Sequence, residues 1–244
     1  MVEVASGVWQ ARAQHVCWVL IVDGAGVTLV DTGYPGDKER VIASLGKIRR
    51  APADVDAVVL THAHPDHLGS AEYFRSQVGK PVWVHEQEEA NATGERVEQV
   101  SIATLLKMAW RPSVLVWFVQ VGAGLKAAQI QRLGAVEKTY SGGALDVPGR
   151  PLAVHTPGHT SGHAALHLPD QGVLVAGDAL MTEHALSTSS GPQLLPDFFN
   201  TDTTQARASL ELLRPLGADV VIPGHGPVFH GTPNQAVDLA LEHR

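Results

Sequence analysis

The side chains best suited to metal chemistry gather in residues 61–67, which read Thr-His-Ala-His-Pro-Asp-His. Three imidazoles and one carboxylate stand within six consecutive positions, directly after an apolar stretch that predicts a buried strand. Imidazole nitrogen and carboxylate oxygen are ligands for zinc, and they also bind iron or manganese. The proline turn can aim the first two histidines at one point, and the aspartate and the last histidine at a second. The candidate ligands are His62, His64, Asp66 and His67.

Three more ligand-type side chains follow predicted strands, and each has a glycine beside it. They are His159 in Thr-Pro-Gly-His, Asp178 in Ala-Gly-Asp and His225 in Pro-Gly-His-Gly. A glycine beside a ligand lets backbone and metal approach closely. One such pair is weak evidence, but three of them in a chain that already holds the cluster at residues 61–67 support each other. We therefore expect these side chains to join the cluster in one metal centre.

The segments around these residues alternate between short apolar strands and amphipathic helices. Apolar runs bounded by turn residues predict the strands, and helical spacing of apolar side chains predicts the helices. Because both ends of the chain show this pattern, we expect two sheets packed face to face and covered by helices, in a single domain over residues 1–244. The expected strands cover residues 16–22, 27–30, 56–60, 81–85, 152–155, 164–168, 173–176 and 218–222, and the expected helices cover residues 38–49, 68–77, 203–213 and 234–242.

The middle of the chain, from about residue 86 to 140, has a different pattern and predicts a helical insertion. Its residues 113–121 form an apolar run that contains Trp117 and Phe118. One interpretation is a helical hairpin packed on the body of the domain. The other is a lid beside the site or a homodimer contact, because exposed aromatic patches mark binding surfaces. The sequence leaves both open.

Composition narrows the class of partner. The formal net charge is -7, and no cluster of Lys and Arg is present, so a nucleic-acid partner is not expected. No apolar run approaches the roughly 20 residues that span a bilayer. The first ten residues do not resemble an export signal, so we expect a cytoplasmic protein. The single cysteine, Cys17, excludes an internal disulfide and is expected to be buried in the apolar run at residues 16–22.

Five segments between Asp31 and His225 resemble the motifs of the metallo-β-lactamase superfamily: Asp-Thr-Gly at residues 31–33, the cluster at residues 61–67, and the three glycine-flanked ligands. The resemblance implies an α+β fold, a four-layer αββα sandwich with a helical insertion. It implies that Asp178 bridges two metal ions, and that Asp31 supports the site from behind by orienting a ligand. It assigns His62, His64 and His159 to one metal, and Asp66, His67 and His225 to the other.

A pair of divalent cations would make this site a hydrolytic centre. We expect two zinc ions, with iron or manganese as alternatives. Two dications that share a water lower its pKa and give a bridging hydroxide near neutral pH, which attacks a carbonyl polarised by one metal. Asp66 is the only carboxylate of the cluster at residues 61–67. It is the candidate catalytic residue, which orients the nucleophile and moves its proton.

The expected substrate is a small molecule with an ester, thioester or lactone bond and an apolar portion. Residues 155–163 are similar to the matching segment of glyoxalase II, and lactonases of the superfamily share the ligand set. A non-haem iron oxidoreductase resembling persulfide dioxygenases is the main alternative, because His and Asp also accept iron. A true β-lactamase is disfavoured, because those enzymes act outside the cytoplasm and lack an aspartate like Asp178.

Substrate contacts are expected from His184, in the loop that follows Asp178, and from Trp117 and Phe118 in the insertion. For His184 the alternative is a solvent-exposed loop histidine. The histidines outside these sets are expected in structural or surface positions: His15, His85, His155, His163, His167, His230 and His243.

Overall fold

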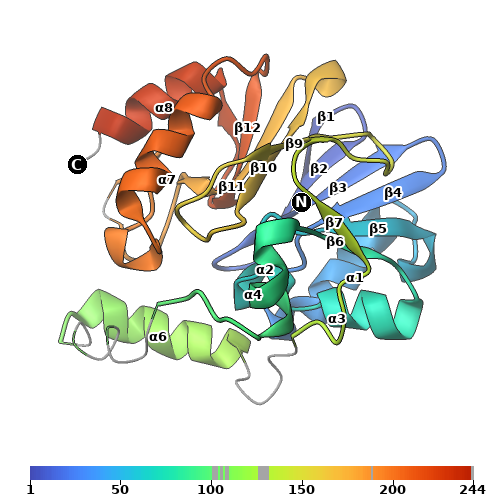
Figure 1. Cartoon of the computed structure of the whole chain (residues 1–244), viewed down its shortest axis with the longest axis horizontal. Coiled ribbons are helices and arrows are strands. Elements are labelled where there is room, and N and C mark those ends of the chain that lie inside the picture. Colours follow the sequence, from blue (N-terminus) through green and yellow to red (C-terminus); the bar gives the residue numbers. More distant parts are fainter. Residues whose placement is uncertain (101–103, 105–106, 108–109, 126–131, 188, 243–244) are drawn as a thin grey trace.

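The computed structural model describes residues 1–100, 104, 107, 110–125, 132–187 and 189–242. Two β-sheets lie face to face, with helices on their outer faces (Figure 1). The first sheet contains, in spatial order, β1 (Val2–Ala5), β2 (Val8–Arg12), β3 (Cys17–Asp23), β4 (Gly26–Val30), β5 (Val55–Val59), β6 (Val82–His85) and β7 (Lys138–Tyr140). The second contains β13 (Phe229–His230), β12 (Val220–His225), β11 (Val173–Met181), β10 (Ala164–Leu168), β9 (Leu152–His155) and β8 (Gly143–Ala144).

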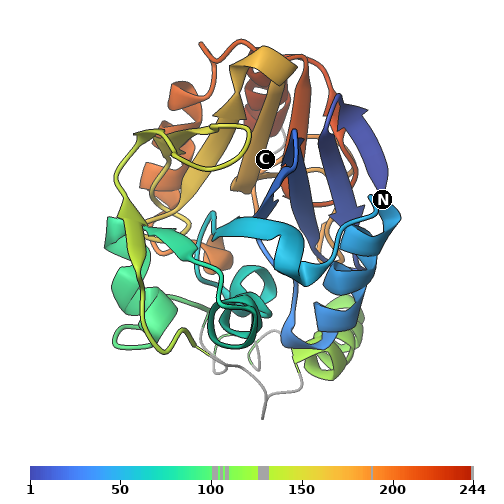
Figure 2. The same cartoon turned by 90° about the vertical axis from the view of Figure 1, so that its right-hand side faces the viewer.

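Helices connect the strands that run parallel. β4, β5, β6 and β7 pair in parallel, as do β11 and β12, and the other neighbours pair antiparallel. A parallel pair needs a crossover connection, and each crossover here contains at least one helix. Figure 2 shows the sandwich turned by 90°, with the strands of the first half (blue) beside those of the second (gold to red). The helices are α1 (Lys38–Lys47), α2 (Pro65–Leu68), α3 (Ala71–Tyr73), α4 (Glu89–Thr93), α6 (Pro112–Leu125), α7 (Thr203–Ser209) and α8 (Pro233–Glu242).

Three apolar layers hold the sandwich together, because the central strands are buried on both faces. On β3, Val19 and Ile21 face the second sheet, whereas Trp18 and Leu20 pack under α1 and α3. The second sheet repeats this arrangement, with Leu174 of β11 facing α7 and α8. Each fully buried side chain of this size contributes about 1.5–3 kcal/mol relative to an exposed one. The four-layer αββα fold expected from the sequence is therefore the fold observed.

Several elements differ from the sequence prediction. The predicted helix at residues 68–77 is broken into α2, α3 and a π-helical turn over residues 74–78. β11 extends to Met181, so Asp178 lies within a strand and not at its end. Gly177 has a left-handed backbone (φ 53°), and the register of β11 shifts beside it. The glycine therefore marks an irregularity within the strand, where the sequence predicts its end. The short strands β1, β2, β7, β8 and β13 were not predicted.

The predicted helical insertion is corrected at its end. Residues 138–140 form β7, which pairs with β6 and completes the first sheet. Residues 101–103, 105–106, 108–109 and 126–131 of the insertion lie outside the described residues. The described part contributes α4 beside the first sheet and α6, which lies along the lower edge of the molecule in Figure 1. Among the described residues, no helix is both long and apolar enough to cross a bilayer.

Candidate metal centre

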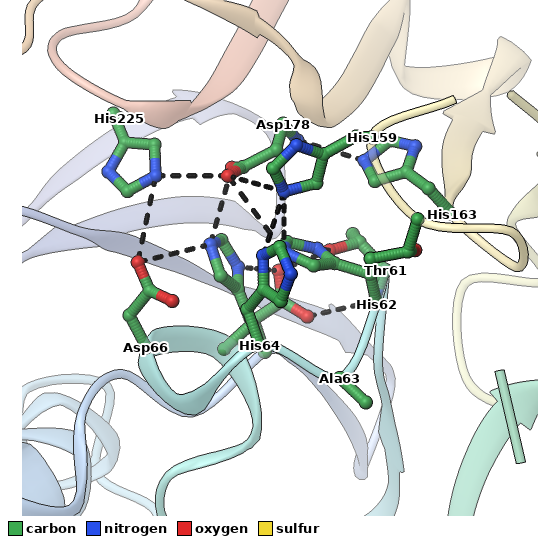
Figure 3. Close-up of polar contacts among 12 residues, drawn as sticks. Thr61, His62, Ala63, His64, Asp66, His159, His163, Asp178 and His225 are labelled. Atoms are coloured by element: carbon green, nitrogen blue, oxygen red, sulfur yellow. Dashed lines mark hydrogen bonds and ion pairs between the residues drawn. The ribbon is translucent and has the colours of Figure 1, made fainter. Parts of the chain in front are cut away.

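The seven predicted ligands meet at one edge of the sandwich, close to β5, β11 and β12. Figure 3 shows the side chains of His62, His64, Asp66, His159, Asp178 and His225 turned toward one another. Four of the seven ligands follow β5, because the chain turns at residues 61–64 and starts α2 at Pro65. His159 lies in the loop between β9 and β10, and His225 is the last residue of β12. All but Asp66 are buried, and the Asp66 carboxylate keeps 16% of its surface exposed.

The side chains form two groups in which every ligand atom lies within 4.8 Å of the others. Asp178 stands between the groups. Its Oδ1 is 3.2 Å from Nε2 of His67, and its Oδ2 is 3.3 Å from Nε2 of His159 and 3.1 Å from Nε2 of His225. One carboxylate therefore faces both groups, the arrangement that a bridging ligand needs. The first group is His62, His64, His159 and Asp178, and the second group is Asp66, His67 and His225.

Each histidine of the two groups has its outward ring nitrogen in a hydrogen bond. Such partners fix the tautomer and orientation of imidazoles that bind metal, and leave the other nitrogen free to coordinate. The pairs are His62 Nδ1 with Thr61 Oγ1, His64 Nε2 with the Glu98 carbonyl, His67 Nδ1 with Asp31 Oδ2, His159 Nδ1 with Asn200 Oδ1, and His225 Nδ1 with the His15 carbonyl.

The inward atoms fit cations better than they fit each other. His159 Nε2 lies 2.9 Å from His64 Nδ1 and 3.2 Å from His62 Nε2, so three imidazole nitrogens converge on one point. Among the described side chains, His67 Nε2 and Asp178 Oδ1 are buried without a hydrogen-bond partner. Buried polar atoms normally have a partner. A divalent cation in each group would satisfy all of these atoms with the nitrogen and oxygen donors that zinc, iron and manganese accept.

Asp31, the residue that the resemblance assigns to the support of a ligand, contacts His67 of the second group. Its Oδ2 accepts a hydrogen bond from His67 Nδ1 at 2.8 Å, and its two oxygens also accept from the backbone and hydroxyl of Thr61. The Asp31 backbone is left-handed (φ 58°), a conformation that costs free energy in residues other than glycine. The surrounding hydrogen bonds hold the carboxylate in place despite this cost.

The pKa values of His62 and His159 in the first group shift in the opposite direction from those of His67 and His225 in the second. Burial lowers the pKa of His62 and His159 well below the ordinary value of 6.5. Burial would also lower the pKa of His67, but the carboxylates of Asp178 and its neighbours outweigh burial and raise the pKa well above 6.5. The pKa of His225 is raised for the same reason, chiefly by Asp178. Without metal, the rings of His62 and His159 are therefore held neutral, whereas the protonated forms of His67 and His225 are stabilised.

Two glycines and one histidine keep Asp178 in place. A Cβ on Gly224 would stand 2.0 Å from Asp178 Oδ1, so only glycine fits where β12 passes this carboxylate. Gly177 has a left-handed backbone, and a Cβ there would stand 2.7 Å from His163 Nε2. That nitrogen accepts the backbone N–H of Asp178 at 2.9 Å, and burial lowers the pKa of His163 to about 4, which keeps the ring neutral. Sequence reasoning placed His163 among structural positions and gave no signal for this contact.

An apolar cluster forms the wall beside the second group. Val16, Tyr34, Trp117 and Val121 are buried there, with Phe199 packed against them. Tyr34 was not singled out in the sequence. Burial and the nearby carboxylate of Asp66 raise its pKa well above 10, so its phenol keeps its proton beside that residue.

His184 and Trp117 lie at this wall, and Phe118 does not. The His184 ring is 5.5 Å from the His225 ring and 5.9 Å from Trp117, measured between ring centroids. Burial lowers the pKa of His184 to about 3, so the ring is neutral and not the exposed loop histidine of the alternative interpretation. Phe118 is 41% exposed and lies outside the apolar cluster. A cavity of about 230 Å³ adjoins His184, and its lining includes Arg12, Glu183 and Gly226.

Comparison with known proteins identifies the family. Residues 12–225 match the Metallo-beta-lactamase superfamily. The chain belongs to this superfamily. A crystal structure of a metallo-beta-lactamase family protein from Thermus thermophilus, TTHA1429, is 27% identical and superposes with a TM-score of 0.68 over 99% of this chain and 80% of that one. BJP-1, a subclass B3 metallo-beta-lactamase of Bradyrhizobium japonicum, has the same TM-score of 0.68 at 16% identity, which shows a shared fold alone.

Two curated members of the superfamily point to hydrolysis. The probable metallo-hydrolase YflN of Bacillus subtilis is 29% identical over 216 residues, which cover 81% of this chain and 74% of that protein. The hydroxyacylglutathione hydrolase GloC of Haemophilus influenzae is 26% identical over 216 residues, covering 87% and 86%. With the two ligand groups, these relatives support a metal-dependent hydrolase, whose substrate they do not establish.

Proposed function

We propose that this protein is a hydrolase with two divalent metal ions that cleaves an ester, thioester or lactone bond in a small substrate with an apolar portion. The observation that carries the proposal is the position of Asp178, whose oxygens lie 3.1–3.3 Å from histidines of both ligand groups. Zinc is the expected metal, held by His62, His64 and His159 in the first group and by Asp66, His67 and His225 in the second. Bound cations would supply a water of lowered pKa and polarise the substrate carbonyl.

Asp66 is the proposed proton carrier. Its carboxylate is the one ligand side chain of the two groups that is not buried, so it can meet both the metal centre and an entering substrate. Its Oδ2 is 3.7 Å from His225 Nε2 and 3.9 Å from His67 Nε2. At this position it would orient the attacking water, accept its proton and pass the proton to the leaving group. The protonated phenol of Tyr34 would help to hold the carboxylate.

The apolar wall supports the choice of substrate class. Val16 belongs to this wall and also lines the cavity of about 230 Å³, which His184 lines as well. A substrate seated there would place its apolar part against this wall and its scissile bond at the metal centre. The neutral ring of His184 would offer one hydrogen bond at the junction.

The first experiment measures metal content and hydrolysis on the same preparation. Elemental analysis of protein purified without added metal is expected to find about two zinc ions per chain, one for each ligand group. A panel of an acyl-homoserine lactone, a glutathione thioester, an aryl ester and a β-lactam then reports the bond cleaved. About one iron per chain without hydrolysis would overturn the proposal in favour of an iron oxidoreductase, and oxygen consumption with a persulfide would be the next assay.

A variant of Asp66 tests the mechanism. Asp66→Asn keeps the size of the side chain but cannot accept the proton, so kcat is expected to fall by about 10²–10⁴-fold. Asp170→Asn, an exposed aspartate in the turn that precedes β11, is the matched control and should keep full activity. Circular dichroism checks that both variants are folded. Full turnover by folded Asp66→Asn protein would remove Asp66 from the mechanism.

A further inference from the structure

Glu88 is a buried carboxylate outside both ligand groups. It ends the short 3-10 turn Glu86–Glu88 that follows β6, and its surface is 0% exposed. A carboxylate without partners is strongly disfavoured in a protein interior, so its hydrogen bonds indicate what it does. Each of its oxygens accepts two hydrogen bonds. The donors are the Ala63 backbone N–H (2.9 Å) and Asn91 Nδ2 (2.6 Å) on Oε1, and Thr160 Oγ1 (2.8 Å) and the Gly162 backbone N–H (3.0 Å) on Oε2.

Three of these donors, Ala63, Thr160 and Gly162, lie in the two loops that carry the histidines of the first ligand group, and the fourth, Asn91, lies in α4. Ala63 separates His62 from His64, and Thr160 follows His159 directly. The two loops lie nearly 100 residues apart in the chain, and their imidazole nitrogens approach within 2.9–3.2 Å. One oxygen of Glu88 therefore holds the loop of two histidines, and the other holds the loop of the third.

A second route leads from Glu88 to the same group. Asn91, which donates to Glu88, accepts the backbone N–H of Glu98 through its Oδ1 at 3.1 Å. The backbone carbonyl of Glu98 in turn accepts a hydrogen bond from His64 Nε2. The side-chain carboxylate of Glu98 accepts one from the Ser161 backbone N–H at 2.7 Å. Arg132 closes the network by donating to the carbonyls of Ala63 and Asn91.

No hydrogen bond of Glu88 in the described structure reaches α2, which carries His67, or β12, which carries His225. Those histidines donate their outer hydrogen bonds to Asp31 and to the His15 carbonyl. We infer that Glu88 is a positioning residue for the first metal-ligand group, and sets the distance between its two loops. The inference rests on the proposed function only in assuming that this group binds a divalent cation.

The network requires a carboxylate at this position. All four partners are used as donors, and the two backbone N–H groups among them, of Ala63 and Gly162, cannot reverse their role. A glutamine would have to turn its NH₂ group toward one of these N–H groups, which would break the hold on one loop. An aspartate is one methylene shorter and cannot reach both loops from the same backbone.

Cobalt(II) binding to metal-free protein tests the inference, because its visible absorption reports ligand geometry without any turnover. Two backgrounds isolate the groups: His225→Ala retains the three histidines of the first group, and His64→Ala retains the second group. In the first background, Glu88→Gln is expected to weaken cobalt binding about 10–100-fold and to change the absorption band. In the second background, cobalt affinity is expected to stay within about threefold, below the smallest effect typical of an outer hydrogen-bond partner.

Two further variants make the result decisive. Glu89→Gln, an exposed neighbour, is the matched control and should bind cobalt normally in both backgrounds. Thr160→Val removes one donor to Glu88 while preserving side-chain shape, and should weaken cobalt binding by the first group alone. This variant replaces Glu88→Gln in the test if Glu88→Gln does not fold. Equal losses in both groups, or no loss in the first, would overturn the inference. Absence of cobalt binding in the unmutated chain would instead overturn the proposed function, so the two failures are distinguishable.

Discussion

The two ligand groups contain similar side chains but are held by different surroundings. In the first group the outer partners of the histidines are neutral: the Thr61 hydroxyl, the Glu98 carbonyl and the Asn200 amide. In the second group His67 is held by a carboxylate, Asp31, and Asp66 is itself a ligand candidate. Carboxylates near an imidazole stabilise its protonated form, whereas burial among neutral groups disfavours it.

This difference determines how each group would receive a cation. A metal ion must find its imidazoles deprotonated, so binding to protonated histidines releases protons. The first group has His62 and His159 with lowered pKa values and is ready to coordinate. The second group has His67 and His225 with raised pKa values, and exchanges protons for the cation. The carboxylates that face the histidines of the second group, Asp178, Asp31 and Asp66, therefore distinguish the two halves of the centre.

The largest expected effect comes from removing the carboxylate partner of His67, which lies outside the second group. Asp31→Asn keeps the size of the side chain, and asparagine tolerates the left-handed backbone found there. His67 would lose its charged partner, so cobalt binding in the His64→Ala background is expected to weaken about 10–100-fold. In the His225→Ala background a smaller loss is expected, because Asp31 also accepts from Thr61, which precedes His62. A larger loss in the first group than in the second would contradict the assignment of Asp31 to His67.

The pH dependence of cobalt binding tests the same contrast without a further substitution. Below its raised pKa, His67 holds a proton that the cation must displace, so the affinity of the second group should fall at least about tenfold for each pH unit of acidification, and more steeply where His225 is also protonated. The lowered pKa of His62 and His159 keeps these two rings neutral, so the first group should lose less affinity than the second between about pH 7.5 and 6.5. Titration of the two single-group backgrounds at these pH values gives both slopes. Equal slopes would show that the carboxylates do not separate the groups.

The sequence was most informative about the ligands and least informative about what holds them. Imidazoles and carboxylates beside glycine and strand ends have a recognisable spacing, and all seven candidates meet at one edge of the fold. The outer partners of His64 and His225 are backbone carbonyls, of Glu98 and His15, which every residue type offers. Glu88 lies 25 positions from Ala63, and no local pattern relates the two.

The insertion shows the same limit at the level of a whole element. The apolar run at residues 113–121 predicted a helix, and α6 is one. Which of its side chains face the site depends on how the helix docks, and the sequence could not decide this because both faces are apolar. In the structure Val114, Trp117 and Val121 point into the molecule, whereas Leu115 and Phe118 are 52% and 41% exposed.

These two faces of α6 give the smallest and most selective effect. Trp117 touches the wall beside the second group, so Trp117→Leu should lower kcat/KM for long-chain relative to short-chain esters by about tenfold, the effect of roughly one methylene in an apolar pocket. Cobalt affinity should not change in either group, because Trp117 holds no ligand. Leu115→Ser, on the outward face, should preserve chain-length preference. Sedimentation of this variant beside the unmutated chain tests the homodimer contact that the sequence left open, which would be weakened by a polar side chain on this face. A shift in preference by Leu115→Ser, with none by Trp117→Leu, would mean that the outward face meets the substrate.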